Sequence, residues 1–275
     1  MHITTVVNRK GGVGKTTLVR NLAYLLAADY GKRVLMIDLD SSGNLSEFFG
    51  AEAPETNEYY GVAELLVNPD ADPREMIHHT TQPNLDILPG NSTIAKAEME
   101  VKLDVMLPQQ YRLAEHLQKI QDDYDFCLID SPPTVDAAIS VINALSCSND
   151  VIIPCTPNAN AIKGVDTITS MVKTVQRYNK ALSIRGVVLC RIGYKKLDKE
   201  LLEAHLSIPR FKTYIRESSA TAEYSEVAHL SFRDYSRKAP VCLDMDNLTA
   251  EYLGVAFPHP EQFDAHPEDD DDDYL

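Results

Sequence analysis

The residues best suited to chemistry lie near the start of the chain, in a glycine-rich stretch with two lysines. They are Lys10, Gly11, Gly12, Val13, Gly14, Lys15, Thr16 and Thr17. Glycines let backbone N–H groups close around phosphate oxygens, and a helix that begins there adds the positive end of its dipole. In such a loop Lys15 can reach the β- and γ-phosphates of a nucleotide, and the Thr16 hydroxyl can ligate Mg²⁺. The stretch therefore predicts a phosphate-binding loop.

The segments that flank this loop place it between a strand and a helix. An apolar, β-branched run covers residues 3–7, and leucines with helical spacing follow the loop at positions 18, 22, 25 and 26. A strand, a glycine-rich turn and a helix in this order form the setting that phosphate binding needs. A glycine-rich loop without a ligand is the alternative, and this setting disfavours it.

Two carboxylates follow a second apolar run, residues 34–38. Asp38 and Asp40 are two positions apart at the end of a predicted strand, so their side chains point to the same side. This position would bring them beside Mg²⁺ and the γ-phosphate. The alternative is an acidic turn that caps the next helix.

A third carboxylate ends the apolar run of residues 126–130. Asp130 is followed by Ser131, Pro132 and Pro133. An apolar strand that ends in aspartate is typical of the element whose carboxylate holds Mg²⁺ or its bound water, and the two prolines keep the next residues out of a helix. Read alone, the segment is only a strand that ends in a turn; together with the lysine–glycine loop it predicts a magnesium site.

Short apolar runs alternate with helical patterns along most of the chain. We predict strands at residues 3–7, 34–38, 85–88, 126–130, 151–154 and 186–190. We predict helices from the glycine-rich loop to about residue 30, over 92–122 with an interruption at Pro108, over 134–145 and over 161–178. This order predicts an α/β fold with a doubly wound, mostly parallel sheet and helices on both faces. The phosphate-binding loop then lies at the carboxyl end of the first strand, where such sheets bind ligands.

The glycine-rich loop departs from the standard G-x-x-x-x-G-K-T pattern, because Arg9 stands where glycine is usual and Lys10 precedes the double glycine. The pattern K-G-G-x-G-K-T-T resembles the deviant Walker A motif of the ParA/MinD superfamily of P-loop ATPases. Over residues 1 to about 240 the chain resembles the ParA/Soj-type partition ATPases. The resemblance implies ATP as substrate, Mg²⁺ as cofactor and a homodimer with ATP sandwiched between the subunits.

The resemblance also implies roles for single residues. Lys10 would act on the nucleotide of the other subunit, and Lys15 on that of its own. Asp40 would position the attacking water and help hold the metal, together with Thr16 and Asp130. Ser41-Ser42 replaces the usual Pro-Gln after Asp40, which puts the hydrolysis rate in doubt more than binding. No contact to the base is assigned, because Cys190-Arg191 stands where the superfamily often places Asn or Thr.

Members of the family bind DNA non-specifically as ATP dimers and are released when a ParB-type centromere-binding adaptor stimulates hydrolysis. We expect the same plasmid or chromosome segregation role here, in a cytoplasmic, nucleoid-associated protein. The basic residues of the C-terminal part are the candidate DNA contacts: Lys195, Lys196, Lys199, Arg210, Lys212, Arg216, Arg233, Arg237 and Lys238. Phosphate contacts need lysines and arginines. A mixed, solvated surface is the alternative, because acidic residues are interleaved.

Other functions of the same superfamily are less consistent with the sequence. A MinD-like membrane cycle needs a basic amphipathic C-terminal helix, and this chain ends in an acidic run. A reductase or metal-cluster carrier needs paired cysteines, and the five cysteines are scattered. A tyrosine kinase would carry a tyrosine cluster in its tail. An ATPase that positions a protein cargo stays open, because the motor is the same and only the adaptor differs.

Composition sets the remaining expectations. Scattered cysteines indicate free thiols in a reducing compartment, and neither a secretory signal nor a membrane-spanning run is present in the sequence. The formal net charge is −15, and eight acidic residues without any Lys or Arg lie in residues 258–275. A segment of this composition cannot bury enough apolar surface to fold. We therefore predict one ATPase domain over residues 1–257 and an acidic disordered tail over 258–275, which solubilises the protein or competes with DNA for a basic surface.

Overall fold

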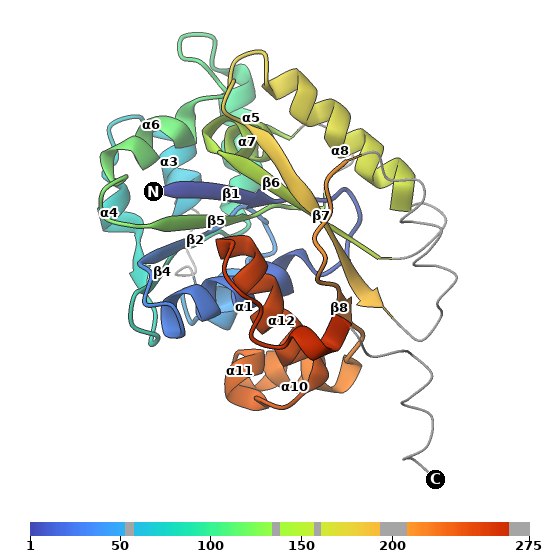
Figure 1. Cartoon of the computed structure of the whole chain (residues 1–275). Helices are drawn as coiled ribbons and strands as arrows, with labels where there is room; N and C mark the ends of the chain where they lie inside the picture. Colours follow the sequence, from blue (N-terminus) through green and yellow to red (C-terminus); the bar gives the residue numbers. More distant parts are fainter. Residues whose placement is uncertain (53–57, 134–137, 157–160, 193–207, 264–275) are drawn as a thin grey trace.

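A computed structural model describes residues 1–52, 58–133, 138–156, 161–192 and 208–263 of the chain (Figure 1). The strands are β1 (His2–Val6), β2 (Val34–Asp38), β3 (His78–His79), β4 (Leu85–Leu88), β5 (Phe126–Asp130), β6 (Asp150–Cys155), β7 (Ser183–Ile192) and β8 (Ile215–Arg216). They form one sheet in the order β3-β4-β2-β5-β1-β6-β7-β8. Every pairing is parallel except that of β3 with β4, so the predicted doubly wound, mostly parallel sheet is confirmed.

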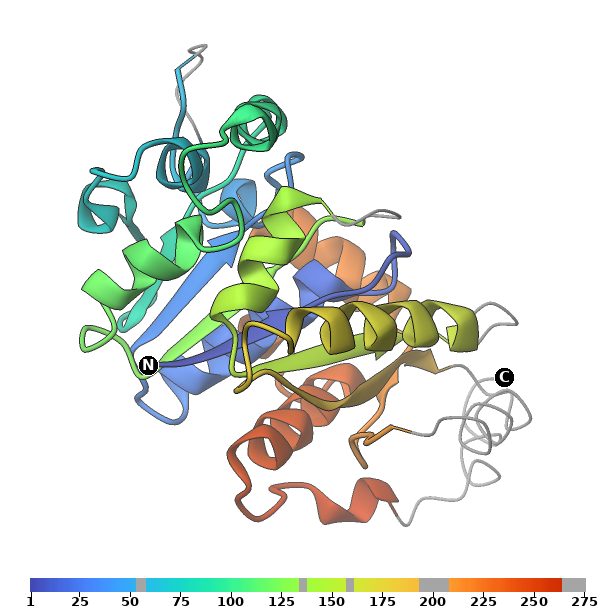
Figure 2. The ribbon, with the colours of Figure 1, turned by 90° about the horizontal axis from the view of Figure 1, so that it is seen from above.

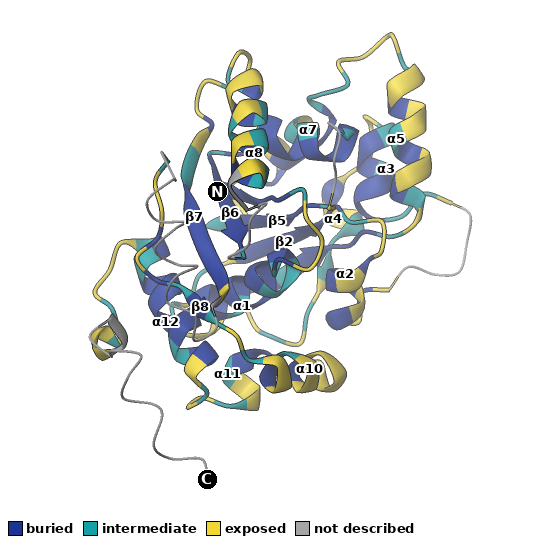
Figure 3. Ribbon diagram, turned by 90° about the vertical axis from the view of Figure 1, so that its right-hand side faces the viewer, coloured by how far each residue is buried: buried dark blue, intermediate teal, exposed yellow. Residues whose placement is uncertain are grey.

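Helices cover both faces of this sheet (Figures 1 and 2). One face carries α1 (Lys15–Ala28), α2 (Asn44–Phe48), α10 (Ser219–Ala228), α11 (Phe232–Tyr235) and α12 (Pro240–Leu253). The other carries α3 (Val62–Val67), α4 (Pro73–Met76), α5 (Thr93–Leu103), α6 (Arg112–Lys119), α7 (Ile139–Cys147) and α8 (Ala161–Val175). In Figure 3 the buried strands run between these two layers.

The alternation of side chains along β2 shows why both layers are needed. Val34 and Met36 pack into the core beneath α1 and α12, whereas Leu35 and Ile37 pack into the core beneath α3 and α5. All four side chains are fully buried. A strand that is apolar at every position has no face to turn toward water, which is why the run predicted a central parallel strand.

The predicted elements differ from the observed ones in several parts of the chain. Helices α2, α3 and α4 are not among the predicted ones. The interruption expected at Pro108 separates α5 from α6. Helix α7 begins at Ile139, because Ala138 before it has an extended backbone; residues 134–137, where we expect the helix to begin, lie outside the described part. No residue pattern predicts β3, because two residues are too few to show a periodicity. Residues 210–216 contribute to the sheet the two residues of β8 and an isolated bridge between Arg210 and Val187.

The first residues of the segment predicted to be a tail fold back onto α12. The Asn247 side chain accepts a hydrogen bond from the His259 backbone N–H at 3.0 Å and donates one to its carbonyl oxygen at 2.8 Å. A short 3₁₀ helix, Pro260–Phe263, follows. This part of the predicted disordered tail is therefore folded, whereas residues 264–275 lie outside the described part of the chain. No helix among the described residues is both long and apolar enough to cross a bilayer.

The loops at the carboxyl ends of β2 and β4 pack directly on each other. The Gly90 N–H donates to Ser46 Oγ at 2.9 Å, and a Cβ at Gly90 would lie 2.1 Å from the carbonyl oxygen of Asp38. The backbone of the Asp38 loop can come this close only because position 90 has no side chain.

We expect Gly90→Ala to lower the free energy of unfolding by about 2–3 kcal/mol, because backbone atoms would have to move to admit the methyl group. Urea denaturation measures the change. Gly164→Ala is the matched control, since its Cβ would lie at an ordinary 3.6 Å from Asn8 Oδ1. A change there of less than about 1 kcal/mol is expected. Equal effects at the two positions would contradict the close packing at Gly90.

Candidate nucleotide site

The glycine-rich loop is built to expose backbone N–H groups at the start of α1. Gly12 and Gly14 take left-handed conformations, with φ of 72° and 93°, which residues with a Cβ rarely adopt. Asn8 anchors the loop from below: its side chain accepts from the Lys10 N–H at 3.0 Å and donates to the Pro154 carbonyl on β6 at 2.6 Å. The loop thus has the shape that the sequence predicted for phosphate binding.

Lys15 lies inside this loop rather than in solvent. Its side chain is buried, and Nζ donates to the carbonyl oxygen of Lys10 at 3.3 Å. Burial lowers the pKa of Lys15, although the carboxylates of Asp130 and Asp40 act in the opposite direction. An anion held by the loop would favour the charged amine in the same way.

Thr16 and Asp130 meet at the end of β5. The Thr16 hydroxyl donates to Asp130 Oδ2 at 2.6 Å. Asp130 is buried, and its Oδ1 has no hydrogen-bond partner among the described residues. Burial, reinforced by the nearby charge of Asp38, raises the pKa of Asp130 to about 8. A hydroxyl oxygen beside a buried carboxylate with an unsatisfied oxygen fits a magnesium ion, because hard cations prefer oxygen ligands and favour the ionised carboxylate.

Asp38 holds the loop that follows it. Its Oδ2 accepts from the backbone N–H of Ser46 at 2.9 Å and from the Ser46 hydroxyl at 2.7 Å, and its Oδ1 accepts from the Asp40 N–H at 3.1 Å. Burial raises the pKa of this carboxyl to about 6. Both oxygens thus bind the following loop and the start of α2, which agrees with the alternative of an acidic turn that caps the next helix. Ser46, eight positions away, carried no signal in the sequence.

Asp40 lies in the loop that Asp38 holds. Its side chain is half-buried, and Oδ1 accepts from the Ser42 N–H at 3.0 Å. The Asp40 charge acts on both Lys15 and Asp130, which places the carboxylate near the two buried groups. Lys10, by contrast, is exposed at the surface of the loop.

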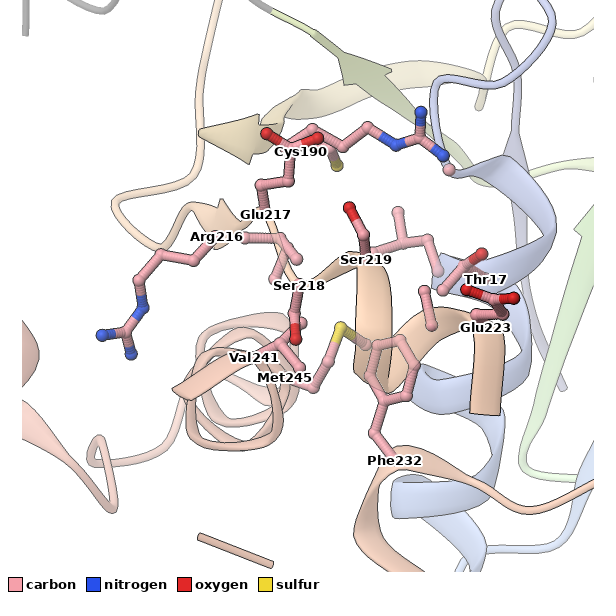
Figure 4. A pocket seen from close by; sticks show the side chains of 15 residues that line it. Thr17, Cys190, Arg216, Glu217, Ser218, Ser219, Glu223, Phe232, Val241 and Met245 are labelled. Carbon is pink, nitrogen blue, oxygen red and sulfur yellow. The ribbon is translucent and has the colours of Figure 1, made fainter. Parts of the chain in front are cut away.

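A pocket of about 320 Å³ opens beside the glycine-rich loop (Figure 4). Its walls come from the start of α1, the end of β7, the segment from β8 into α10, α11 and α12. The lining residues are Gly14, Thr17, Leu18, Cys190, Arg191, Ile215, Arg216, Glu217, Ser218, Ser219, Ala222, Glu223, Phe232, Val241 and Met245. Arg191 adopts a left-handed conformation, with φ of 56°. Apart from the loop residues, sequence reasoning did not assign this wall, since it is assembled from segments far apart in the chain.

The candidate DNA contacts fall into three groups. Lys195, Lys196 and Lys199 lie outside the described residues. Arg216 and Arg233 form ion pairs within the domain: Arg216 with Asp244 at 2.8 Å, and Arg233 with Asp29 and Asp246 at 3.1 and 3.0 Å. The candidates with exposed side chains are Arg210, Lys212, Arg237 and Lys238.

Comparison with known proteins identifies the family. A family profile described as an AAA domain matches residues 1–184. The sporulation initiation inhibitor protein Soj of Bacillus subtilis is 34% identical over 252 residues, which is 88% of this chain and 96% of Soj. The chain belongs to the ParA/MinD family of P-loop ATPases. The chromosome-partitioning ATPase Soj of Treponema pallidum is 37% identical over 200 residues, 72% of this chain and 74% of that protein.

The fold of this ParA-family ATPase also matches solved structures. An ATP complex of McdA from Cyanothece superposes with a TM-score of 0.80 at 20% identity, over 93% of this chain and 97% of McdA. Identity at this level supports the shared fold alone.

Among the described residues, no group of three or more His, Cys, Asp or Glu side chains gathers in a metal-binding arrangement.

We predict that Asp130→Asn stabilises the metal-free, nucleotide-free protein, and that the gain increases with pH. Because the pKa of Asp130 rises from 3.8 to about 8 on folding, the folded wild type keeps a proton that the unfolded chain releases. The free energy of unfolding of the wild type therefore decreases as the pH rises from 3.8 to about 8, whereas asparagine does not titrate. We expect the variant's advantage to be about 2–4 kcal/mol larger at pH 8 than at pH 4.

Urea denaturation in EDTA at the two pH values measures this difference. An advantage that is the same at both pH values would show that Asp130 is ionised throughout and contradict the raised pKa.

Proposed function

We propose that this ParA-family protein is an ATP-dependent switch for segregating DNA. It binds Mg²⁺-ATP, dimerises around the nucleotide and binds DNA non-specifically. It dissociates from the DNA when a ParB-type adaptor stimulates hydrolysis. The observation that carries the proposal is the contact of Thr16 with Asp130 beside the buried Lys15. It supports a site for a metal-bound triphosphate in a chain that is 34% identical to Soj over most of its length.

The nucleotide would extend from the loop into the adjacent pocket. The loop N–H groups and Lys15 would take the phosphates, and the pocket would take the nucleoside. Leu18, Phe232, Val241 and Met245 offer apolar surface for a base, while Ser218 and Ser219 offer hydroxyl groups. Figure 4 shows Phe232, Met245 and Ser219 around this pocket. Pockets of this kind, mostly apolar with a few polar groups, suit a flat heterocycle joined to a sugar.

Each charged residue at the site has a role that its position supports. Lys15 would neutralise charge on the transferred phosphoryl group, and the half-buried Asp40 would orient the attacking water. Thr16 and Asp130 would hold Mg²⁺, which when bound would offset negative charge on the phosphate groups. Lys10 is exposed, as a residue that acts on a second subunit's nucleotide has to be in the monomer.

The candidate DNA contacts that have exposed side chains define the proposed DNA-binding surface. Arg237 and Lys238 lie side by side in sequence just before α12, and Lys212 lies exposed just before β8. With a net charge of −15, the chain as a whole repels DNA, so binding depends on such local clusters and on their doubling in a dimer.

We expect Lys15→Ala to abolish Mg²⁺-ATP binding, whereas Lys10→Ala keeps binding within about tenfold and loses ATP-dependent dimerisation and hydrolysis. The reason is that Lys15 lies inside its own loop and Lys10 does not. Calorimetry measures binding, and light scattering with and without ATP measures mass. A Lys10→Ala protein with a normal dimer and normal turnover would rule out the role of Lys10 in trans.

Binding to random-sequence duplex DNA tests the switch. We expect retention with Mg²⁺-ATP and none with Mg²⁺-ADP at moderate salt. Replacing Arg237 and Lys238 by glutamate should weaken retention at least about tenfold, because two phosphate contacts per subunit are lost. Replacing Lys173 and Arg177 by glutamate is the matched control, since these exposed residues lie on and just after α8, on the other face of the sheet.

Equal losses in the two double variants would show that net charge, not this cluster, controls binding. No retention in either nucleotide state, with ATP binding intact, would favour an ATPase that positions a protein cargo instead.

A further inference from the structure

A buried arginine on the phosphate-loop helix joins the nucleotide pocket to the Asp40 loop. Arg20 belongs to α1 and is 1% exposed. Its guanidinium carbon lies 3.9 Å from the centre of the Phe48 ring and 6.0 Å from that of Phe232. Both distances are within the range of cation–π attraction, and burial strengthens the closer contact.

Phe48 contacts a second partner as well. The His229 ring stacks on it, with centroids 5.6 Å apart and an interplanar angle of 18°. His229 Nδ1 lies 3.0 Å from the carbonyl oxygen of Phe48. His229 is the left-handed residue that follows α10, with φ of 51°. Phe48 is thus held by a cation from α1 and by a ring at the end of α10. We call Arg20, Phe48 and His229 the Phe48 clamp.

The Phe48 clamp holds the helix that follows the Asp40 loop. Helix α2 is five residues long; Asn44 is its first residue and Phe48 its last. Its first turn is tied to the sheet through Ser46 and Asp38, and its last residue is held by the clamp. A helix this short has little stability of its own, so its position, and that of the loop before it, depends on these two attachments.

The clamp is joined to the nucleotide pocket as well. Arg20 donates to Glu226 Oε2 at 2.6 Å and to Ser225 Oγ at 3.1 Å, both on α10. The first half of the same helix lines the pocket with Ser219, Ala222 and Glu223, and Phe232 lines it from α11. A base that enters the pocket would therefore press on two elements, α10 and Phe232, that contact Arg20.

We propose that Arg20 is a positioning residue that transmits occupancy of the nucleoside pocket to the Asp40 loop through Phe48. The inference rests on the proposed ATPase function and adds a link within it. Filling the pocket fixes α10 and Phe232, these fix Arg20, and the stacked Phe48 fixes α2 and the carboxylate of Asp40. Hydrolysis then requires a bound nucleoside as well as bound phosphates.

A tryptophan reporter at Phe49 makes the link measurable. The chain has no tryptophan, and the Phe49 ring lies 5.0 Å from Phe48 in an edge-on arrangement. In a Phe49→Trp background, we expect Mg²⁺-ATP to change the emission, and Mg²⁺ with inorganic tripolyphosphate, which fills only the loop, to change it by less than half as much.

Arg20→Met in the same background tests the clamp. It keeps a long apolar side chain and removes the guanidinium. We expect the ATP-induced emission change to fall at least twofold and kcat at least fivefold, while the KM and Kd for ATP change less than threefold. Glu226→Gln is the matched control: it removes the charge of the exposed partner of Arg20 but keeps a side-chain oxygen that can accept the hydrogen bond from Arg20. The contact with α10 and the contact with Phe48 are both kept, so both readouts should stay near those of the parent.

Three results would overturn the inference: an unchanged emission response and kcat in Arg20→Met, a loss of ATP affinity that accounts for the loss of rate, or equal losses in Glu226→Gln. If Arg20→Met does not fold, as judged by thermal melting, Phe48→Leu replaces it and the same criteria apply. A parent protein that does not bind Mg²⁺-ATP would overturn the proposed function itself. A parent that binds ATP without hydrolysing it still gives the emission result.

Discussion

The burial of several charged groups at the carboxyl ends of neighbouring central strands is the constraint on which the rest of this structure depends. The parallel register pairs Val6 with Asp130 and Asp130 with Asp38, so two carboxylates lie on neighbouring strands. Burial raises the pKa of both carboxyls, and the charge of Asp38 raises the pKa of Asp130 further. Such an arrangement is stable only if other groups supply hydrogen bonds or positive charge.

The two carboxylates find different partners. Asp38 is satisfied within the protein by Ser46 and the Asp40 backbone, so it serves the architecture of the loop. Asp130 keeps one oxygen without a partner in the described part of the chain and has only Thr16 at the other. A group left short of partners in this way is destabilising on its own, and a bound cation would relieve it. This difference is why Asp130, and not Asp38, is the proposed ligand of magnesium.

Some of the basic residues expected to contact DNA form ion pairs within the domain instead. Two of the arginines in the C-terminal part form ion pairs within the domain: Arg216 of β8 pairs with Asp244 of α12, and Arg233 of α11 pairs with Asp246 of α12 and with Asp29, the residue after α1. These pairs join β8 and α11 to α12, and α11 to the end of α1, and so help position the elements that line the pocket beside the glycine-rich loop. Basic residues in a sequence thus serve both packing and binding, and only their contacts separate the two uses.

The sequence by itself determined the α/β class, the phosphate-binding loop and the positions of Thr16, Lys15 and Asp130 at strand or helix ends. These are local properties, because each follows from the residue types within one strand, turn or helix. The family followed from the same motif. The role of Asp38, the fold of residues 258–263 and the two-residue strands β3 and β8 did not follow, because they depend on contacts that have no local pattern. The nucleoside pocket and the Phe48 clamp are the extreme case: Arg20 and Ser225 are 205 positions apart, and only the packing of α10 against α1 brings them together.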